Sequence, residues 1–124
     1  MRSVPLFFVA HSRAGDKANA LTMSLIPYQQ DDYAVIEQQV TVEAVIKHFD
    51  LPGPSKVFRY SLPRLAAFNF VFEDVLDGGV NDSMLLDRHG KSRSSFFLTM
   101  DILVPPTHPS INLQKKYIAA YSGF

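Results

Sequence analysis

Near the N-terminus, ten mostly small or charged residues separate two apolar segments, and several of them could do chemistry. The polar members of this group are His11, Ser12, Arg13, Asp16, Lys17 and Asn19. Arg13 and Lys17 can bind a carboxylate or a phosphate because both carry a positive charge at neutral pH. Asp16 can orient one of these cations or act as a base. The alternative is an ordinary hairpin loop, since loops are polar in most proteins.

Two further groups of residues could contribute to a binding site. Gly78 and Gly79, within the segment DGGVND, let a ligand or another chain approach the backbone closely. The alternative there is the end of a helix followed by a turn. Asn69 falls on or near the apolar side of an expected helix, where a buried amide must find partners. Its side chain either bonds to the backbone or reaches into a pocket.

The residue types also exclude several kinds of chemistry. The chain has no cysteine, which excludes disulfides, thiolate catalysis and zinc–cysteine sites. Its four histidines are widely separated, so we predict no metal site and no cofactor. Twelve basic residues balance twelve acidic ones without runs of like charge, so no whole-chain field attracts nucleic acid or a membrane surface.

The apolar segments on either side of the polar group predict the first two strands. Residues 4–10 are apolar on both faces, which is typical of a covered, central strand. Residues 20–27 alternate, with Leu21, Met23 and Leu25 on one side, which predicts a half-buried strand. Because the connection is short, we expect these strands to be antiparallel neighbours and the polar group to be the loop between them.

The middle of the chain predicts helices and a third strand. Residues 31–49 favour two short helices, with Asp31 and Thr41 as their N-terminal caps. Residues 55–62 favour a strand. From Pro63 to the paired glycines, apolar residues recur at helical spacing and predict a helix. The alternative is a strand through FNFVFEDVL, because Phe and Val favour sheets.

The C-terminal part predicts a last pair of strands and a tail. Residues 82–88 and 94–104 favour two strands joined by a turn at Gly90. Residues 105–124 follow as a short amphipathic helix or strand. Since this tail carries apolar side chains, we expect it to dock on the domain or on a neighbouring subunit.

Helices mixed with largely antiparallel strands predict an α+β fold, a two-layer sandwich whose helices pack on one face of the sheet. A chain of 124 residues has the size of one domain, which we place at residues 1–104, before the tail. The lack of cysteine and of a signal-peptide pattern favours a cytoplasmic protein. Nothing approaches the roughly 20 apolar residues of a membrane span.

Three segments, in this order, resemble one family. AHSRAGDKANAL resembles the arginine–glycine–aspartate–lysine–asparagine signature of the AtuA-like domain, named after acyclic terpene utilisation protein A. LPRLAAFNFVFEDVLDGGV resembles the segment of that family that ends in several glycines, and SMLLDRHGKSRSSFFLTMDI resembles its terminal strand pair. The resemblance covers about residues 4–104. Ala18 stands where the family usually has glycine, and two glycines stand where it has three.

The resemblance implies a ferredoxin-like fold and a stand-alone short form of a domain that otherwise ends a larger chain. Larger relatives are linked to the breakdown of branched terpenes as coenzyme A thioesters. It therefore implies a small accessory or substrate-binding subunit in acyl-CoA catabolism, with a larger AtuA-type chain and an acyl-CoA or other anion as partners. By position, the residues expected to bind the ligand are Arg13, Asp16, Lys17, Asn19, Asn69, Gly78 and Gly79.

Two alternatives belong to other functional classes. The chain could be a non-catalytic oligomerisation module, in which Asp16 and Lys17 tie the loop and the tail closes a homo-oligomer. It could also be an independent hydratase or lyase, which requires an acid/base pair. His11 and Asp16 are the loop candidates for that pair. No catalytic residue is assigned, and we expect no catalysis by the chain on its own.

Overall fold

The structure is a computed structural model, and it describes residues 1–17, 20–51, 56–73 and 93–121. The strands are β1 (Arg2–Pro5), β2 (Ala10–His11), β3 (Ala14–Lys17), β4 (Ala20–Pro27), β5 (Lys56–Leu62), β6 (Ala67–Glu73) and β7 (Asp101–Val104). The helices are α1 (Tyr33–Gln39), α2 (Val42–Phe49), α3 (Arg93–Phe97) and α4 (Pro109–Tyr121). Short 3-10 turns are η1 (Leu6–Phe8), η2 (Gln30–Asp32) and η3 (Pro63–Leu65).

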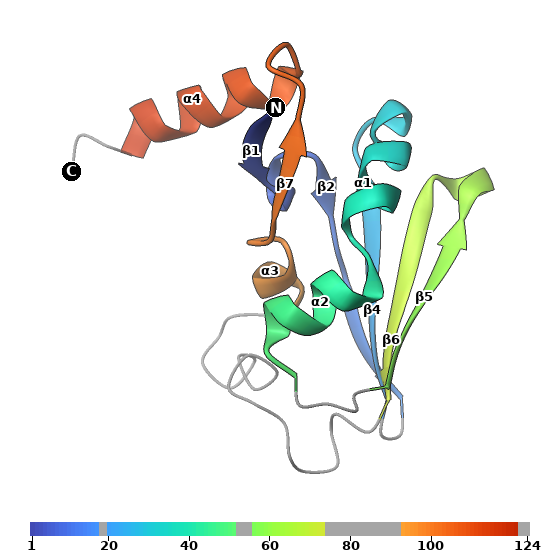
Figure 1. Ribbon diagram of the computed structural model, residues 1–124. Helices are drawn as coiled ribbons and strands as arrows, with labels where there is room; N and C mark the ends of the chain where they lie inside the picture. The colour runs from blue at the N-terminus through green and yellow to red at the C-terminus, as the bar shows by residue number, and fades with distance from the viewer. Residues whose placement is uncertain (18–19, 52–55, 74–92, 122–124) are drawn as a thin grey trace.

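The larger sheet runs in the order β2–β4–β6–β5, with β3 also paired to β4 (Figure 1). A second, two-stranded sheet joins β1 to β7. Every described pair is antiparallel. The helices α1, α2 and α3 pack against one face of the larger sheet, where the Tyr33 ring of α1 stacks on Phe68 of β6 at 4.6 Å. The predicted α+β, ferredoxin-like sandwich is confirmed.

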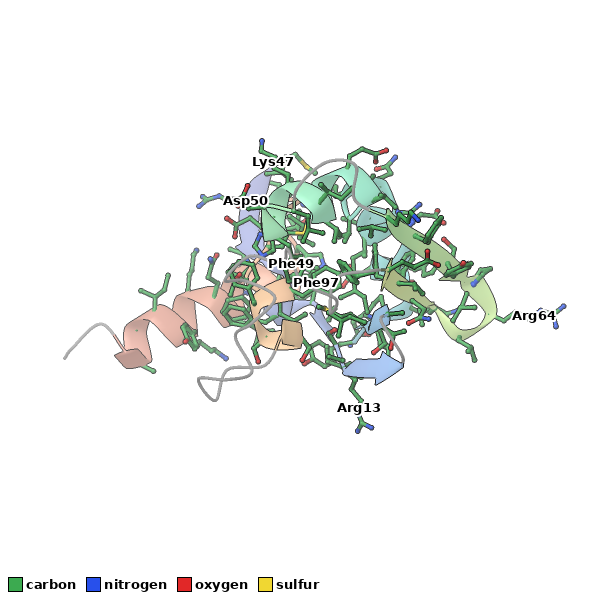
Figure 2. All side chains as sticks on the ribbon, turned by 90° about the horizontal axis from the view of Figure 1, so that it is seen from below. Arg13, Lys47, Phe49, Asp50, Arg64 and Phe97 are labelled. Carbon is green, nitrogen blue, oxygen red and sulfur yellow. The ribbon has the colours of Figure 1, made fainter. Side chains whose placement is uncertain are left out.

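The core lies between that face, here called the inner face, and the helices. Its sheet side comes from the period-two pattern of β4 and β6, whose inward side chains are all at most 1% exposed: Leu21, Met23, Leu25, Phe68, Phe70 and Phe72. Phe49 of α2 and Phe97 of α3 fill the helix side, and both lie in the interior in Figure 2. Each fully buried side chain of this size stabilises the fold by about 2 kcal/mol relative to an exposed one.

The first predicted strand, residues 4–10, is wrong as a single strand. The chain leaves β1 at Pro5, makes the turn η1 and enters the larger sheet as β2. The cause is tertiary, because β1 pairs with β7 whereas β2 pairs with β4. The turn carries the backbone from one sheet to the other, and the amide of Leu6 donates to the Met100 carbonyl at 2.7 Å.

The helix predicted from Pro63 is also wrong, and the strand alternative is correct. Pro63 opens only the turn η3, which ends at Ala66 with a left-handed φ of 48°. That residue reverses the chain, so β6 folds back antiparallel on β5. The third strand, predicted at residues 55–62, is confirmed as β5 within one residue. The strand is more stable than the helix here because β6 gains hydrogen-bonded neighbours on both sides, β4 and β5.

The last predicted strand pair differs as well. Residues 82–88 and the turn at Gly90 lie outside the described residues, as do Gly78 and Gly79. Of the second strand, 94–104, the first part is the helix α3 and only β7 is extended. Phe97 explains the difference, since in α3 its ring packs edge-on against Phe70 at 5.3 Å and closes one end of the core.

The two central helices are present, but only one predicted cap is correct. The Thr41 hydroxyl accepts from the Ala44 amide at 3.1 Å and caps α2 as expected. Asp31 does not cap α1, because the turn η2 precedes the helix and puts Asp32 at the N-cap position. Asp32 makes no cap hydrogen bond either, since its carboxylate bonds to His108 at 2.8 Å.

The C-terminal segment forms the helix α4, which contacts the chain mainly through its beginning. Ser110 and Ile111 are 1% and 7% exposed, and Tyr117 packs edge-on against Phe8 at 5.6 Å. Beyond these contacts the helix extends away from the two sheets (Figure 1). Within the described residues, no helix is long and apolar enough to cross a membrane. The division into a domain at 1–104 and a tail stays a prediction.

Candidate functional site

The polar group that the sequence predicts as a loop is largely a strand. His11 of β2 pairs with Ile26 of β4, and Asp16 and Lys17 of β3 pair with Leu21 and Ala20. Between the two strands the pairing continues, because the Ser24 amide donates to the Arg13 carbonyl at 2.9 Å. The expected antiparallel neighbours are therefore correct, but the loop is wrong: the charged residues lie along the hairpin.

Strand register brings Arg13 and Asn69 into one row, although they are far apart in the sequence. Ser24 lies opposite Arg13 and accepts from its amide at 3.0 Å. On its other side Ser24 pairs with Asn69, and Asn69 pairs with Tyr60 of β5. Cross-strand partners share one face of a sheet. These four residues, Arg13, Ser24, Asn69 and Tyr60, are called the polar row.

The polar row lies on the outer face, opposite the core. Next to it runs a second row in which Gly15, Thr22, Val71 and Phe58 pair in turn. Arg13, Tyr60 and Phe58 are exposed, the last two at 54% and 43%. Figure 2 shows Arg13 projecting away from the body of the molecule. The described part of the outer face is thus an open surface that carries the cations Arg13 and Lys56 and an aromatic edge on β5.

Gly15 lies where two strands of the hairpin approach each other closely. It lies within β3, opposite Thr22, whose hydroxyl donates to the Gly15 carbonyl at 3.2 Å. A Cβ at this position would meet that same hydroxyl oxygen at 3.2 Å, which is a tight contact. The residue therefore favours close approach of two strands.

The other predicted ligand residues are not brought together by the described structure. The backbones of Asp16 and Lys17 lie near the end of the hairpin, while Asn19, Gly78 and Gly79 lie outside the described residues. His11 stacks on Tyr28 at 5.4 Å, at the opposite end. Five residues of extended chain place the backbones of His11 and Asp16 about 16 Å apart, too far for an acid/base pair.

The sequence did not predict a series of hydrogen bonds that the fold forms at the beginning of α4. His108 Nδ1 accepts from the Ser110 amide at 3.1 Å and lies 2.6 Å from the Ser110 hydroxyl. The ring proton is therefore on Nε2, which donates to Asp32 Oδ1 at 2.8 Å. Asp32 and His108 are 76 positions apart. The one local signal was Pro109, a residue type that favours the first position of a helix.

Ser110, His108 and Asp32 are the residue types of a hydrolytic triad. Their geometry instead favours a structural role, the attachment of α4 to the rest of the protein. Ser110 is 1% exposed, so its hydroxyl is covered rather than presented to a substrate. His108 contacts the first turn of its own helix and thereby caps α4. The hydrogen bond from His108 to Asp32 then joins this cap to η2, which follows β4. The arrangement attaches α4 to the rest of the chain.

Among the described residues, no three side chains of the metal-binding types come together. Comparison with known proteins gives one match, the family model described as the AtuA ferredoxin-like domain, over residues 4–103. No curated protein and no solved structure matches.

Proposed function

Because this chain belongs to the AtuA ferredoxin-like domain family, we propose that it is a small accessory subunit that binds a larger AtuA-type chain through its outer sheet face. The observation that carries this proposal is the aromatic edge of that face. Phe58, Tyr60 and Leu62 project from one side of β5 and are 43%, 54% and 40% exposed. Soluble monomers rarely expose neighbouring apolar side chains in this way, and such patches mark binding surfaces.

The shape of the face favours a macromolecule over one small anion. Arg13 and Asn69 are separated by two strand spacings, about 10 Å. A single phosphate is too small to contact the whole polar row and the aromatic edge at once. A protein surface can contact the whole polar row and the aromatic edge together. It would gain most from Tyr60 and Arg13, residue types that dominate interface energies.

In this proposal the complex acts in the catabolism of acyl-CoA intermediates, and Arg13 holds an anionic group. That group is either a carboxylate of the partner chain or a phosphate of the coenzyme A thioester. Arg13 suits both, because a guanidinium forms paired hydrogen bonds with either group. The chain itself contributes binding, and the reacting groups belong to the larger partner.

The test is to mix the chain with a larger AtuA-type chain and to measure complex formation by light scattering and calorimetry. The double variant Phe58→Ser/Tyr60→Ser should weaken the complex at least about thirtyfold, since two aromatic anchors are lost. Leu103→Ser is the control, because Leu103 is 48% exposed on β7 of the other sheet. Equal affinity for the double variant and the wild type would refute the proposal.

The anionic group is tested separately. Arg13→Ala should reduce binding of a branched acyl-CoA to the mixed complex, whereas Arg64→Ala should not. Arg64 is a matched control because it too projects into solvent, from the turn η3 (Figure 2). If Arg13→Ala weakens the protein complex but not thioester binding, the anion is a carboxylate of the partner. If neither measurement changes, Arg13 has no part in binding.

A second candidate function is homo-oligomerisation through α4. Leu113 and Ile118 of this helix are 50% and 55% exposed, and the helix extends away from the sheets. Ile118→Ser should then lower the mass in solution while leaving the circular dichroism unchanged. A wild-type chain that is monomeric at high concentration would refute this candidate and leave the first one intact.

A further inference from the structure

A cavity of about 510 Å³ lies between η1, the end of β4 and the beginning of α4, away from the outer sheet face. Its lining includes Phe8, Tyr28, Asp31, Asp32 and Leu113. We propose that this cavity binds a small organic cation, an ammonium or guanidinium group on an apolar body. This inference is independent of the function proposed above, since it concerns other residues and another ligand.

The charged side chains that line the cavity favour a ligand with a positive charge. Asp31 and Asp32 each contribute a carboxylate, the described lining contains no lysine or arginine, and its imidazole, His108, donates to Asp32. Asp31 is exposed, so its charge is available to a ligand at the mouth of the cavity. Asp32 is 8% exposed and gives one oxygen to His108. An anion such as an acyl-CoA phosphate would be repelled by this pair of charges.

The walls favour an apolar body that carries the cation. Phe8 and Tyr28 place aromatic rings on the cavity, and a cation over a ring face is attracted by its quadrupole. Phe8 packs against Tyr117 at 5.6 Å, and Tyr28, which is 60% exposed, stacks on His11 at 5.4 Å. These ring contacts orient the aromatic walls in part, which lowers the entropic cost of binding.

The beginning of α4 is the one feature of the cavity that would favour an anion. A helix N-terminus carries about half a positive charge on its free amides. Here those amides already have partners, because Ser110 donates to His108 Nδ1 and Ile111 donates to the His108 carbonyl. The charge of Asp32, joined to the same ring, opposes the helix dipole. The cavity as a whole remains negative.

The experiment uses three probes of similar shape on ¹⁵N-labelled protein: 2-phenylethylammonium, the neutral 2-phenylethanol and the anionic 3-phenylpropionate. We expect the ammonium to shift the amide signals of Phe8, Tyr28 and Leu113 at the lowest concentration. The neutral probe should bind about tenfold more weakly, and the anion should not bind. Added salt should weaken the ammonium complex, because Asp31 is exposed.

Two variants complete the test. Asp31→Asn should weaken ammonium binding about fivefold, the loss of one screened charge contact. Asp101→Asn, an exposed carboxylate on β7, is the matched control and should change nothing. Leu113→Trp should narrow the cavity and weaken ammonium binding, because the larger ring takes up part of its volume.

Two results would overturn the inference. Equal affinity for the ammonium and neutral probes would show that the carboxylates do not select the ligand. Unchanged ammonium binding in both Asp31→Asn and Leu113→Trp would show that the probe binds elsewhere on the chain. Either result leaves the proposed accessory role, which rests on the outer sheet face, to be decided by its own variants.

Discussion

Replacing His108 with alanine tests how α4 is attached to the rest of the chain. The imidazole bonds to groups on both sides: it caps the first turn of α4 through Nδ1 and donates to Asp32 through Nε2. The two side chains are only 15% and 12% exposed. Water therefore cannot fully replace the imidazole as a partner of Asp32 or of the Ser110 hydroxyl, so the variant leaves buried polar groups unsatisfied.

The expected loss follows from two contributions. Removing a helix cap costs about 1 kcal/mol. Leaving the mostly buried Asp32 carboxylate without its donor costs about 2 kcal/mol more. We expect a total of about 3 kcal/mol if α4 and the sheets unfold together, which lowers the Tm by about 12 °C for a chain of this size. If α4 detaches alone, the same free energy appears as local opening.

Urea titration by circular dichroism measures the global loss, and amide hydrogen exchange measures the local one. The amides of Ser110 and Ile111 should lose about a hundredfold of protection in His108→Ala. His108→Asn separates the two contributions, because asparagine can cap the helix but is too short to reach Asp32. It should recover about 1 kcal/mol of the loss.

Unchanged stability together with unchanged exchange at Ser110 and Ile111 in His108→Ala would refute the reasoning. A loss of equal size in His108→Asn would show that the cap contributes nothing and that Asp32 alone holds the helix.

Three further changes probe the core and its supports. Phe49→Ala should cost about 4 kcal/mol in a urea titration, because the ring is fully buried between α3 and the sheet; a loss below about 1 kcal/mol would contradict that packing. Thr41→Ala should cost about 1 kcal/mol and Thr41→Ser much less, since the serine hydroxyl can still accept from the Ala44 amide. Arg59→Met should cost about 2 kcal/mol, because Nη1 donates to the Glu37 and Val40 carbonyls at 2.8 and 3.0 Å; an unchanged urea midpoint would show these contacts to be dispensable.

Local patterns in the sequence predict those elements whose stability depends on their own residues. The alternation of Leu21, Met23 and Leu25 gives β4 with the correct inner face. Thr41 caps α2 because a hydroxyl at this position bonds to an amide three residues away. The α+β class follows in the same way from the mixture of both patterns.

Where two periods fit the same residues, the sequence could not decide. Phe68 and Phe72 are four apart, which suits a helix face, and with Phe70 they also suit a strand. The structure has a strand because β4 and β5 pair with it on both sides, a gain that local propensity does not contain.

The candidate site shows the same division. The sequence pattern indicated Arg13 and Asn69 as separate candidates. It predicted a loop at Arg13, because charged residues are typical of loops. Small and polar residues alternate from Ala10 to Ala14 but not through β3, so the pattern gave no clear signal for that strand.

The sequence by itself determined the fold class, the faces of β4 and the cap of α2, and it pointed to the family. Tertiary structure alone decided that Arg13 and Asn69 share one row through Ser24, and that His108 reaches Asp32. The reason is that strand register and helix docking join residues that are distant in the chain. Their free energy comes from partners that no local pattern names, so these contacts exist only once the sheet and α4 are assembled.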